Sequence, residues 1–374
     1  MPDDTVTAAD PTDPSGGPVL RHTPLLGAHR AAGARLVEFG GWEMPLAYGD
    51  GTLAEHRACR TRAVVFDVSH LGTVRVEGDD AFDRLQSALS NDLRKVAPGR
   101  AQYTHLLDDD GSVVDDIIVW WVADGVFDVM PNASNTSRVV AAIGGVDTTA
   151  SRAVLAVQGP SARSLLAPVA PVAAHVGRFA VTSFEWEGVT CAAAGTGYTG
   201  EDGVECAVPA EAAEEFWDAV VAAGVTPAGL GARDTLRLEV ALPLHGHELG
   251  PGITPLQAGL GWVVGWDKED FRGRAALVAE RAMGPQRTLV GLTTEGRRPP
   301  REGSVVSVDG APVGAVTSGN FSPMLGTGIA LAFVEGDGRR LLSQPVEVEV
   351  RGNPLVGTVV ATPFVRAGQW ADGS

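Results

Sequence analysis

The sequence is poor in cysteine and in basic residues, and both shortages limit its class. Its three cysteines, Cys59, Cys191 and Cys206, form no CxxC pair and no Cys/His cluster at metal-ligand spacing. An odd number of scattered cysteines is typical of a cytoplasmic protein, in which the thiols stay reduced. Lys and Arg number 29 against 46 Asp and Glu, for a net charge of -17. We therefore expect no nucleic-acid partner, because such binding depends on clustered Lys and Arg at phosphates.

Long apolar runs are also missing. The longest candidates, such as LLAPVAPVAAHV, fall short of the roughly 20 apolar residues that span a bilayer, so we expect no membrane segment. Residues 1–19 contain acidic residues, Pro and Gly in place of the basic start and apolar stretch of a signal peptide. This composition predicts a disordered tail, and residues 369–374 form a second short tail.

Strand and helix signals alternate irregularly through residues 20–285, which favours an α+β class without repeated βαβ winding. Helical spacing of apolar residues predicts one helix after Asp80 and another over Glu211–Ala223, stopping at Gly224. From about residue 290 the helical period disappears. Two similar segments, SVVSVDGAPVGAVT and PVEVEVRGNPLVGTVV, each predict a pair of short strands around a turn. We expect a separate all-β barrel domain over residues 286–368.

Aspartates are concentrated in LLDDDGSVVDDIIVWW, which predicts a turn at Asp110-Gly111 and then a strand from Val113 to Trp121. In a strand, alternate residues share a face, so Asp116 lies with Val114, Ile118 and Trp120, and Asp115 lies on the opposite face. We expect the Asp116 carboxylate to be held among large apolar groups, which raises its pKa and prepares it for proton transfer. The alternative is that all these aspartates are solvated turn and edge-strand residues.

The segment GTGYTG, residues 195–200, satisfies G-x-G-x-x-G but lacks the helix that must follow in a dinucleotide site. Because GEDG leads into the strand-like GVECAVP, we interpret the segment as a turn loop and expect no nucleotide. Tyr198 lies at its tip and Glu205 in the following strand. A phenol and a carboxylate near a tight backbone suit the donor edge of a flat heterocycle, although a turn Tyr and a strand Glu more often have structural roles.

Arg233 in GLGARDTLRLE follows a glycine-rich entry to an apparent helix. An acidic protein needs a cation to hold an anionic ligand, and Arg grips carboxylates in a bidentate manner. The alternative is a surface network in which Arg233 pairs with its charged neighbours. His245 and His247 in LHGHE would share one face of a strand, but no third ligand is apparent, so we expect no metal.

Taken together, these segments resemble the glycine cleavage T-protein family from about Arg21 to Arg366. The matching stretches, in one order, are RHTPLLGAHRAAGARLVEFGGWEMPLAYG, FDVSHLG, SNDL, AQYTHLLDDDGSVVDDIIVW, TGYTGEDGVE, PAGLGARDTLRLE, TSGNFSPMLGTGIALA and PFVR. The resemblance implies a three-domain cloverleaf: two interleaved α+β domains with antiparallel sheets over residues 20–285, and a jelly-roll-like C-terminal β-barrel.

The resemblance also implies a site. The family's essential aspartate maps to Asp116, its pterin contacts to Tyr198 and Glu205, and its arginine for the glutamate tail to Arg233. Further implied folate contacts are Tyr103, Leu71, Asn132, Trp120, Trp262 and Arg366. The sequence departs from the family where Leu71 replaces a frequent Met, where Pro131 precedes Asn132, and where LHGHE replaces LYG.

The implied activity is that of an aminomethyltransferase, which moves the methylene carbon from the dihydrolipoyl arm of the partner, lipoylated H-protein, to tetrahydrofolate and releases ammonia. One alternative is a folate-dependent demethylase of the same fold that acts on a free methylated amine or sulfonium compound. Another is a folate-binding protein of iron-sulfur cluster assembly. That group carries K-G-C-Y-x-G-Q-E, whereas the corresponding loop here reads GTGYTGEDG without the cysteine.

Overall fold

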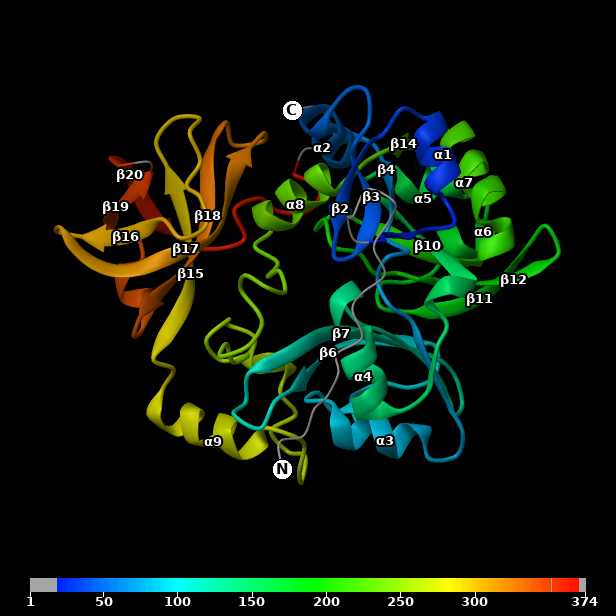
Figure 1. Ribbon diagram of the computed structural model, residues 1–374, viewed down its shortest axis with the longest axis horizontal. Helices are drawn as coiled ribbons and strands as arrows, with labels where there is room; N and C mark the ends of the chain where they lie inside the picture. The colour runs from blue at the N-terminus through cyan, green and yellow to red at the C-terminus, as the bar shows by residue number, and fades with distance from the viewer. Residues whose placement is uncertain (1–18, 351, 370–374) are drawn as a thin grey trace.

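The computed structural model describes residues 19–350 and 352–369. The two expected tails therefore lie outside the described residues, apart from Val19 and Gln369. Figure 1 shows three lobes arranged around a centre, with the C-terminal strands in one lobe and two α+β lobes making up the rest. In the described part of the chain, no helix is both long and apolar enough to cross a membrane.

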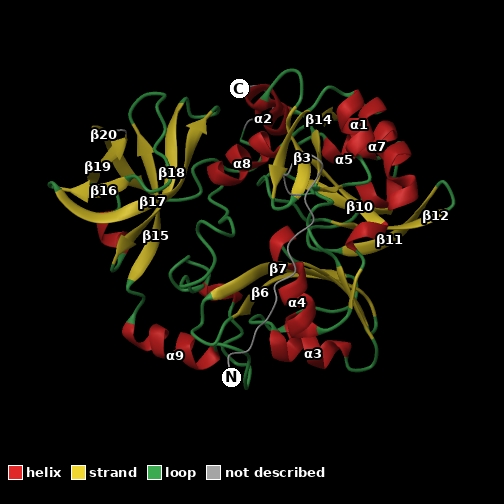
Figure 2. Ribbon diagram, viewed as in Figure 1, coloured by secondary structure: helices red, strands yellow, loops and turns green. Residues whose placement is uncertain are grey.

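The first α+β lobe is a five-stranded antiparallel sheet with the order β6-β7-β8-β5-β9. Its apolar face is covered by helices α3 and α4, and Figure 2 shows both on one side of the strands. The elements are β5 (Val74–Glu77), α3 (Ala81–Ala88), β6 (Arg100–Leu107), β7 (Val113–Ala123), β8 (Val126–Met130), α4 (Thr136–Ile143) and β9 (Val146–Asp147).

The second α+β lobe is a six-stranded sheet with the order β11-β12-β13-β10-β4-β14, antiparallel except where β14 joins β4. Its strands are β4 (Val64–Asp67), β10 (Arg152–Gln158), β11 (Val181–Trp186), β12 (Val189–Ala194), β13 (Gly203–Pro209) and β14 (Thr226–Pro227). Because β4 precedes the whole five-stranded sheet and β10 follows it, the first lobe is an insertion between two neighbouring strands of the second. The two α+β units are thus interleaved along the chain.

Helices cover both faces of the six-stranded sheet, so its central strands are buried on both sides. One face carries α1 (Leu26–Ala31), α5 (Ala162–Leu166), α6 (Pro171–Ala174) and α7 (Ala213–Ala222); the other carries α2 (Thr52–Thr61) and α8 (Leu230–Glu239). A small sheet packs beside them, formed by β1 (Arg21–His22), β2 (Arg35–Phe39) and β3 (Trp42–Ala47).

The third lobe is a closed six-stranded barrel, joined to the α+β lobes through α9 (Arg274–Met283). Its strands are β15 (Arg287–Thr294), β16 (Val305–Val308), β17 (Ala311–Ser322), β18 (Thr327–Glu335), β19 (Pro345–Val350) and β20 (Asn353–Val360). Pairing of β20 with β15 closes it around an apolar core. Both expected hairpins are confirmed as β16/β17 and β19/β20. Asp309 and Gly310 have φ of 49° and 78°, the left-handed pair that tight hairpin turns require.

The predicted helices are confirmed as α3 and α7, and the predicted strand as β7. Rejection of the dinucleotide motif is also confirmed, because GTGYTG leads into strand β13. The expectation that His245 and His247 share a strand face is wrong. Residues 246–248 form a tight turn, in which Gly246 has φ of 90° and its N–H bonds the carbonyl of Leu249.

Candidate active site

Strand β7 carries two adjacent carboxylates that face opposite sides of the five-stranded sheet. Asp115 is 0% exposed and lies on the core face with Val113 and Ile117, whereas Asp116 is partly exposed. The predicted alternation is therefore confirmed. Burial raises the pKa of Asp116, as expected. The structure adds hydrogen-bond donors to both of its oxygens, and the fully sealed carboxylate is Asp115.

Both oxygens of Asp116 accept a hydrogen bond. The Tyr103 hydroxyl on β6 donates to Oδ2 over 3.1 Å, and the Asn132 side-chain amide donates to Oδ1 over 2.8 Å. Burial raises the pKa of Asp116, while these two donors and the charge of nearby His245 act to lower it. A carboxylate in this state remains a usable base, because each oxygen keeps a lone pair and its proton affinity exceeds that of an exposed aspartate.

Asp115 is joined to Asp116 through the same amide. Asn132 donates from its side chain to Asp115 Oδ1 over 2.8 Å and from its backbone to Oδ2 over 3.0 Å. Asn135 also donates to Oδ1, over 2.8 Å. Burial, followed by the negative charge of Asp116, raises the pKa of Asp115 to about 7. Asp115 and Asn135 are not among the site residues expected from the sequence. The signal for them is PNASN, whose amides supply the donors that a sealed carboxylate needs.

His245 stabilises the backbone just before this carboxylate pair. Its Nε2 lies 2.9 Å from the Val114 carbonyl oxygen, which also accepts from Asn135 over 3.2 Å. From the sequence, His245 was considered only as a metal ligand, and its link to β7 was not expected. His247, its partner in that motif, instead contacts the barrel through the Thr317 carbonyl.

Arg233 lies in the first part of α8 and faces the loop after β12. Its guanidinium lies over the ring of Tyr198, 4.9 Å from the centroid, and 6.0 Å from the Phe66 centroid. Its Nη1 is buried without a hydrogen-bond partner in the described structure. Burial lowers the pKa of Arg233, and the charge of Glu205 opposes that shift. An unsatisfied buried guanidinium nitrogen indicates a place for an acceptor from outside the chain.

The alternative interpretation, a network among neighbouring charges on α8, holds for other members of the helix. Arg237 pairs with Asp234 over 2.9 Å and with Glu248 over 3.1 Å. Glu239 pairs with Arg60 and His56 over 3.0 Å. Arg233 belongs to none of these pairs in the described structure, which separates it from its structural neighbours.

Tyr198 and Glu205 lie near Asp116 and Arg233. The Tyr198 hydroxyl donates to the Pro243 carbonyl, and its pKa is raised by burial and by the charge of Asp116, among other groups. Glu205 on β13 accepts from the Thr196 hydroxyl over 2.5 Å. Tyr198 is thus within electrostatic reach of both Asp116 and Arg233, so the structure brings the four principal predicted residues together.

The remaining predicted residues occupy different environments. Trp120 is fully buried between the two sheets, and its Nε1 has no hydrogen-bond partner within residues 19–350 and 352–369. Leu71 packs against the α8 side of the six-stranded sheet. Trp262 is 65% exposed, and its ring lies tilted against the Tyr103 ring, with 6.1 Å between the ring centroids. Arg366 is exposed; the adjacent Val365 N–H bonds the carbonyl at the end of α8, and no side-chain bond joins Arg366 to the other site residues in the described chain.

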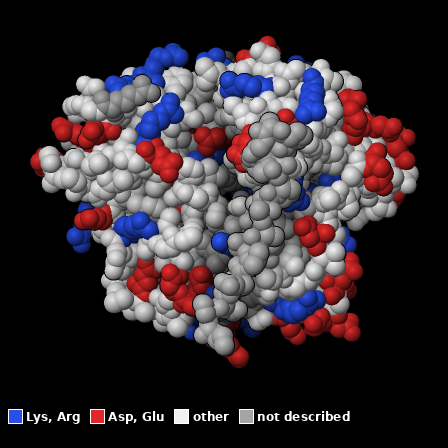
Figure 3. Space-filling model, viewed as in Figure 1, with Lys and Arg blue, Asp and Glu red and all other residues white. Residues whose placement is uncertain are grey.

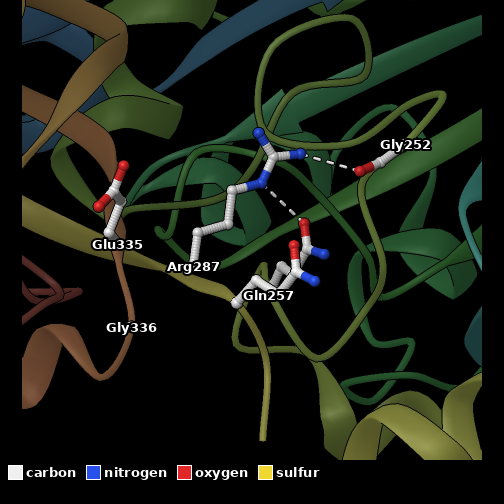
Figure 4. A pocket seen from close by; sticks show the side chains of 6 residues that line it. Gly252, Gln257, Arg287, Glu335 and Gly336 are labelled. Carbon is white, nitrogen blue, oxygen red and sulfur yellow. Dashed lines mark hydrogen bonds between the residues drawn. The ribbon is translucent and has the colours of Figure 1, made fainter.

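Two cavities lie elsewhere, at the barrel edge. The first has a volume of about 610 Å³, and in Figure 4 Arg287 points across it toward Gln257 and Gly252. The second, about 730 Å³, adjoins it and shares Gln257. Neither is lined by a predicted site residue. On the face shown in Figure 3, acidic and basic side chains of the described residues are interspersed without a broad basic patch.

The fold is of the α+β class with an appended β-barrel, and its candidate site is built around a carboxylate. Residues 25–268 match the GCVT N-terminal domain, and residues 287–366 match the glycine cleavage T-protein C-terminal barrel domain. The chain belongs to the glycine cleavage T-protein family, the aminomethyltransferases of the glycine cleavage system.

Individual relatives agree over nearly full length. The aminomethyltransferase of Mycobacterium tuberculosis (strain ATCC 25618 / H37Rv) is 46% identical over 360 residues, covering 93% of this chain and 98% of the relative. That of Frankia alni is 47% identical, covering 92% and 98%. The crystal structure of glycine cleavage system aminomethyltransferase T from Bartonella henselae has a TM-score of 0.85 at 33% identity and covers 92% of this chain and 98% of that chain.

Proposed function

We propose that this aminomethyltransferase transfers the methylene carbon carried by lipoylated H-protein to tetrahydrofolate, with Asp116 as the catalytic carboxylate. The observation that carries the proposal is the hydrogen-bonded Asp116 carboxylate, held within electrostatic reach of Tyr198 and His245. A partly exposed carboxylate among fixed donors suits a base and an electrostatic stabiliser of a cationic transition state.

The chemistry assigned to Asp116 is proton transfer at a folate nitrogen. The aminomethyl carbon exchanges its bonds to the amine and to the lipoyl sulfur for bonds to two folate nitrogens. The amine leaves as ammonia and the sulfur as a thiol, and they take up the two protons released by the folate nitrogens. Asp116 accepts a proton from the folate nitrogen as that nitrogen attacks, and the charge of Asp116 stabilises the iminium-like transition state.

Arg233 supplies the cation that an acidic protein needs for an anionic substrate. The unpaired Nη1 beside the Tyr198 ring fits a carboxylate of the folate tail, while Tyr198 and Glu205 suit the pterin. The remaining proposed folate contacts are Tyr103, Asn132, Leu71, Trp120, Trp262 and Arg366. We place the reaction in the cytoplasm, and the three free cysteines support this compartment because their thiols persist under reducing conditions.

The test is a coupled assay with H-protein, the decarboxylase component, glycine and tetrahydrofolate, in which ammonia and methylenetetrahydrofolate are both measured. The proposal requires the two products in equal amounts and dependence on lipoylated H-protein. Demethylation of a free methylated amine, with no ammonia from aminomethyl-lipoyl H-protein, would instead support a demethylase and overturn the proposal.

The folate-binding half is tested separately with Arg233→Ala. Loss of a charge-assisted hydrogen bond to a carboxylate costs roughly 1.5 to 3 kcal/mol, so the folate Kd should rise at least about tenfold. Isothermal titration calorimetry measures the Kd. Arg272→Ala removes a half-exposed arginine, just before α9, that pairs with Asp108 in the β6–β7 turn. It is the matched control and should leave the folate Kd unchanged. An unchanged Kd for Arg233→Ala rejects the assignment.

A further inference from the structure

His105 lies next to the proposed catalytic carboxylate, and nothing in the preceding assignment uses it. It stands directly across the β6/β7 pair from Asp116, and its side chain is 0% exposed. Its Nε2 is 3.2 Å from the Tyr103 hydroxyl oxygen, and the two rings meet edge-on at 5.2 Å. That hydroxyl is in turn 3.1 Å from Asp116 Oδ2. A chain of three side chains therefore ends at the carboxylate.

The direction of the hydrogen bonds in this chain follows from the strengths of the acceptors. Tyr103 has one hydroxyl proton and two neighbours at similar distances, and a carboxylate is a stronger acceptor than a neutral imidazole. The proton therefore belongs on the Asp116 side, which leaves the hydroxyl oxygen to accept from a protonated His105 Nε2. The opposite tautomer would leave an N–H at the buried Nδ1, where no acceptor lies among the described residues.

We propose that His105 is a positioning residue for aminomethyl transfer: its Nε2–H donates to the Tyr103 hydroxyl oxygen and keeps the Tyr103 O–H directed at Asp116 Oδ2. The inference rests on the proposed function of Asp116. Burial lowers the pKa of His105 to about 3, so the ring stays neutral and serves as a fixed donor at working pH. A neutral donor orients Tyr103 without adding a positive charge that would weaken Asp116 as a base.

Removing this donor frees the Tyr103 hydroxyl to rotate away from the carboxylate. The ionised form of Asp116 then loses one stabilising bond, so its pKa rises and the acid limb of the kcat profile moves to higher pH. The titratable groups that interact with Asp116 across the site are Asp115, Tyr103, Tyr198 and His245. All four are present in the single His105 variants below, so a displaced pH profile in a single variant reports the loss of the donor itself.

The experiment uses a set of matched substitutions at one position. His105→Gln places an amide nitrogen near the original Nε2, and His105→Asn places one near Nδ1, out of reach of Tyr103. His105→Leu removes the polar group and keeps the buried volume similar. Each is measured in the coupled assay for kcat, folate KM and pH profile, alone and combined with Tyr103→Phe, and thermal midpoints are recorded for all.

The proposal predicts about a three- to tenfold lower kcat for His105→Leu and His105→Asn, with little change in folate KM and an acid limb at higher pH. His105→Gln should restore most of the activity. In the Tyr103→Phe background, itself about tenfold slower, His105→Leu should have no further effect. Independent losses in that background, or a wild-type pH profile in His105→Leu, would overturn the inference. An inactive wild-type enzyme would instead overturn the proposed function.

Discussion

The turn between β6 and β7 and the strand β7 itself are both rich in aspartate, but their carboxylates have opposite environments. At the turn, Asp109 is 83% exposed and pairs with Arg272 over 2.8 Å. A few residues later, Asp115 is fully buried and accepts three hydrogen bonds from Asn132 and Asn135. In the sequence the two groups look alike, as DDD at residues 108–110 and DD at residues 115–116.

The difference lies in which force controls the proton. The Arg272 guanidinium lowers the pKa of Asp109, since the folded state favours its charged form. In β7, burial raises the pKa of Asp115 to about 7, and its charged neighbour Asp116 adds to that shift. Hydrogen bonds from Arg272 and Ser112 thus favour the ionised forms of Asp109 and Asp110, whereas burial raises the pKa of both β7 carboxylates and brings that of Asp115 to about 7.

The largest loss of turnover among these aspartates is expected at Asp116. Asp116→Asn keeps the shape and removes the charge, so both the base and the electrostatic stabilisation are lost. General-base and electrostatic effects are each worth roughly 10²-fold or more, and we expect kcat in the coupled assay to fall by at least about 10²-fold. The variant should fold, because Asn still offers an acceptor to Tyr103 or Asn132. Near-normal turnover would show that Asp116 is no more catalytic than the turn aspartates.

Asp115 should have a smaller effect, on stability. Every group that contacts its oxygens is an N–H donor, so Asp115→Asn places its own NH₂ against a donor at either oxygen. Leaving such donors unsatisfied costs about 1–3 kcal/mol of unfolding free energy. Urea unfolding of wild type and variant, monitored by circular dichroism, measures the difference.

The same variant tests the direction of the pKa shift. Because the folded pKa of Asp115 is raised to about 7, the folded state binds this proton more tightly than the unfolded chain. The stability contributed by the group is complete below the unfolded pKa and is lost as pH rises through the folded value. The gap between wild type and Asp115→Asn should narrow by at most roughly 1.4 kcal/mol per pH unit between about pH 4 and 7. A gap that widens would contradict a raised pKa.

Much of the fold was predictable because its signals are local. The strand period of Val113 to Trp121 gave β7 and the opposite facing of its two aspartates, and the repeated hairpins gave the barrel. Which face of β7 is sealed was not predictable, since it depends on α3, α4 and the neighbouring sheet. The hydrogen-bond donors around Asp115 and Asp116 were not predictable for the same reason, because alternation identifies faces but not what packs on them.

The missed site residues share a physical cause. Asn135 and His245 reach the Val114 carbonyl from an α-helix entrance and from a distant turn, and no spacing rule connects them to β7. His105 was hidden because a buried histidine in a strand has many structural roles. Conversely, the charged residues on α8 also fitted a surface network. Only the three-dimensional contacts separate Arg233, whose Nη1 has no hydrogen-bond partner among the described residues, from the paired Arg237.

The smallest effect belongs to the turn. Asp109→Asn removes an exposed ion pair with Arg272, while Asp108 still binds that arginine over 2.6 Å. Exposed pairs contribute little, because water and salt screen them and two flexible side chains must be ordered. We expect kcat, folate KM and the urea midpoint to match wild type within error, at low and at high salt. Since Asp109→Asn and Asp116→Asn make the same chemical change within one hairpin, equal losses of turnover would mean that net negative charge near β7, rather than the hydrogen-bonded position of Asp116, supports the reaction.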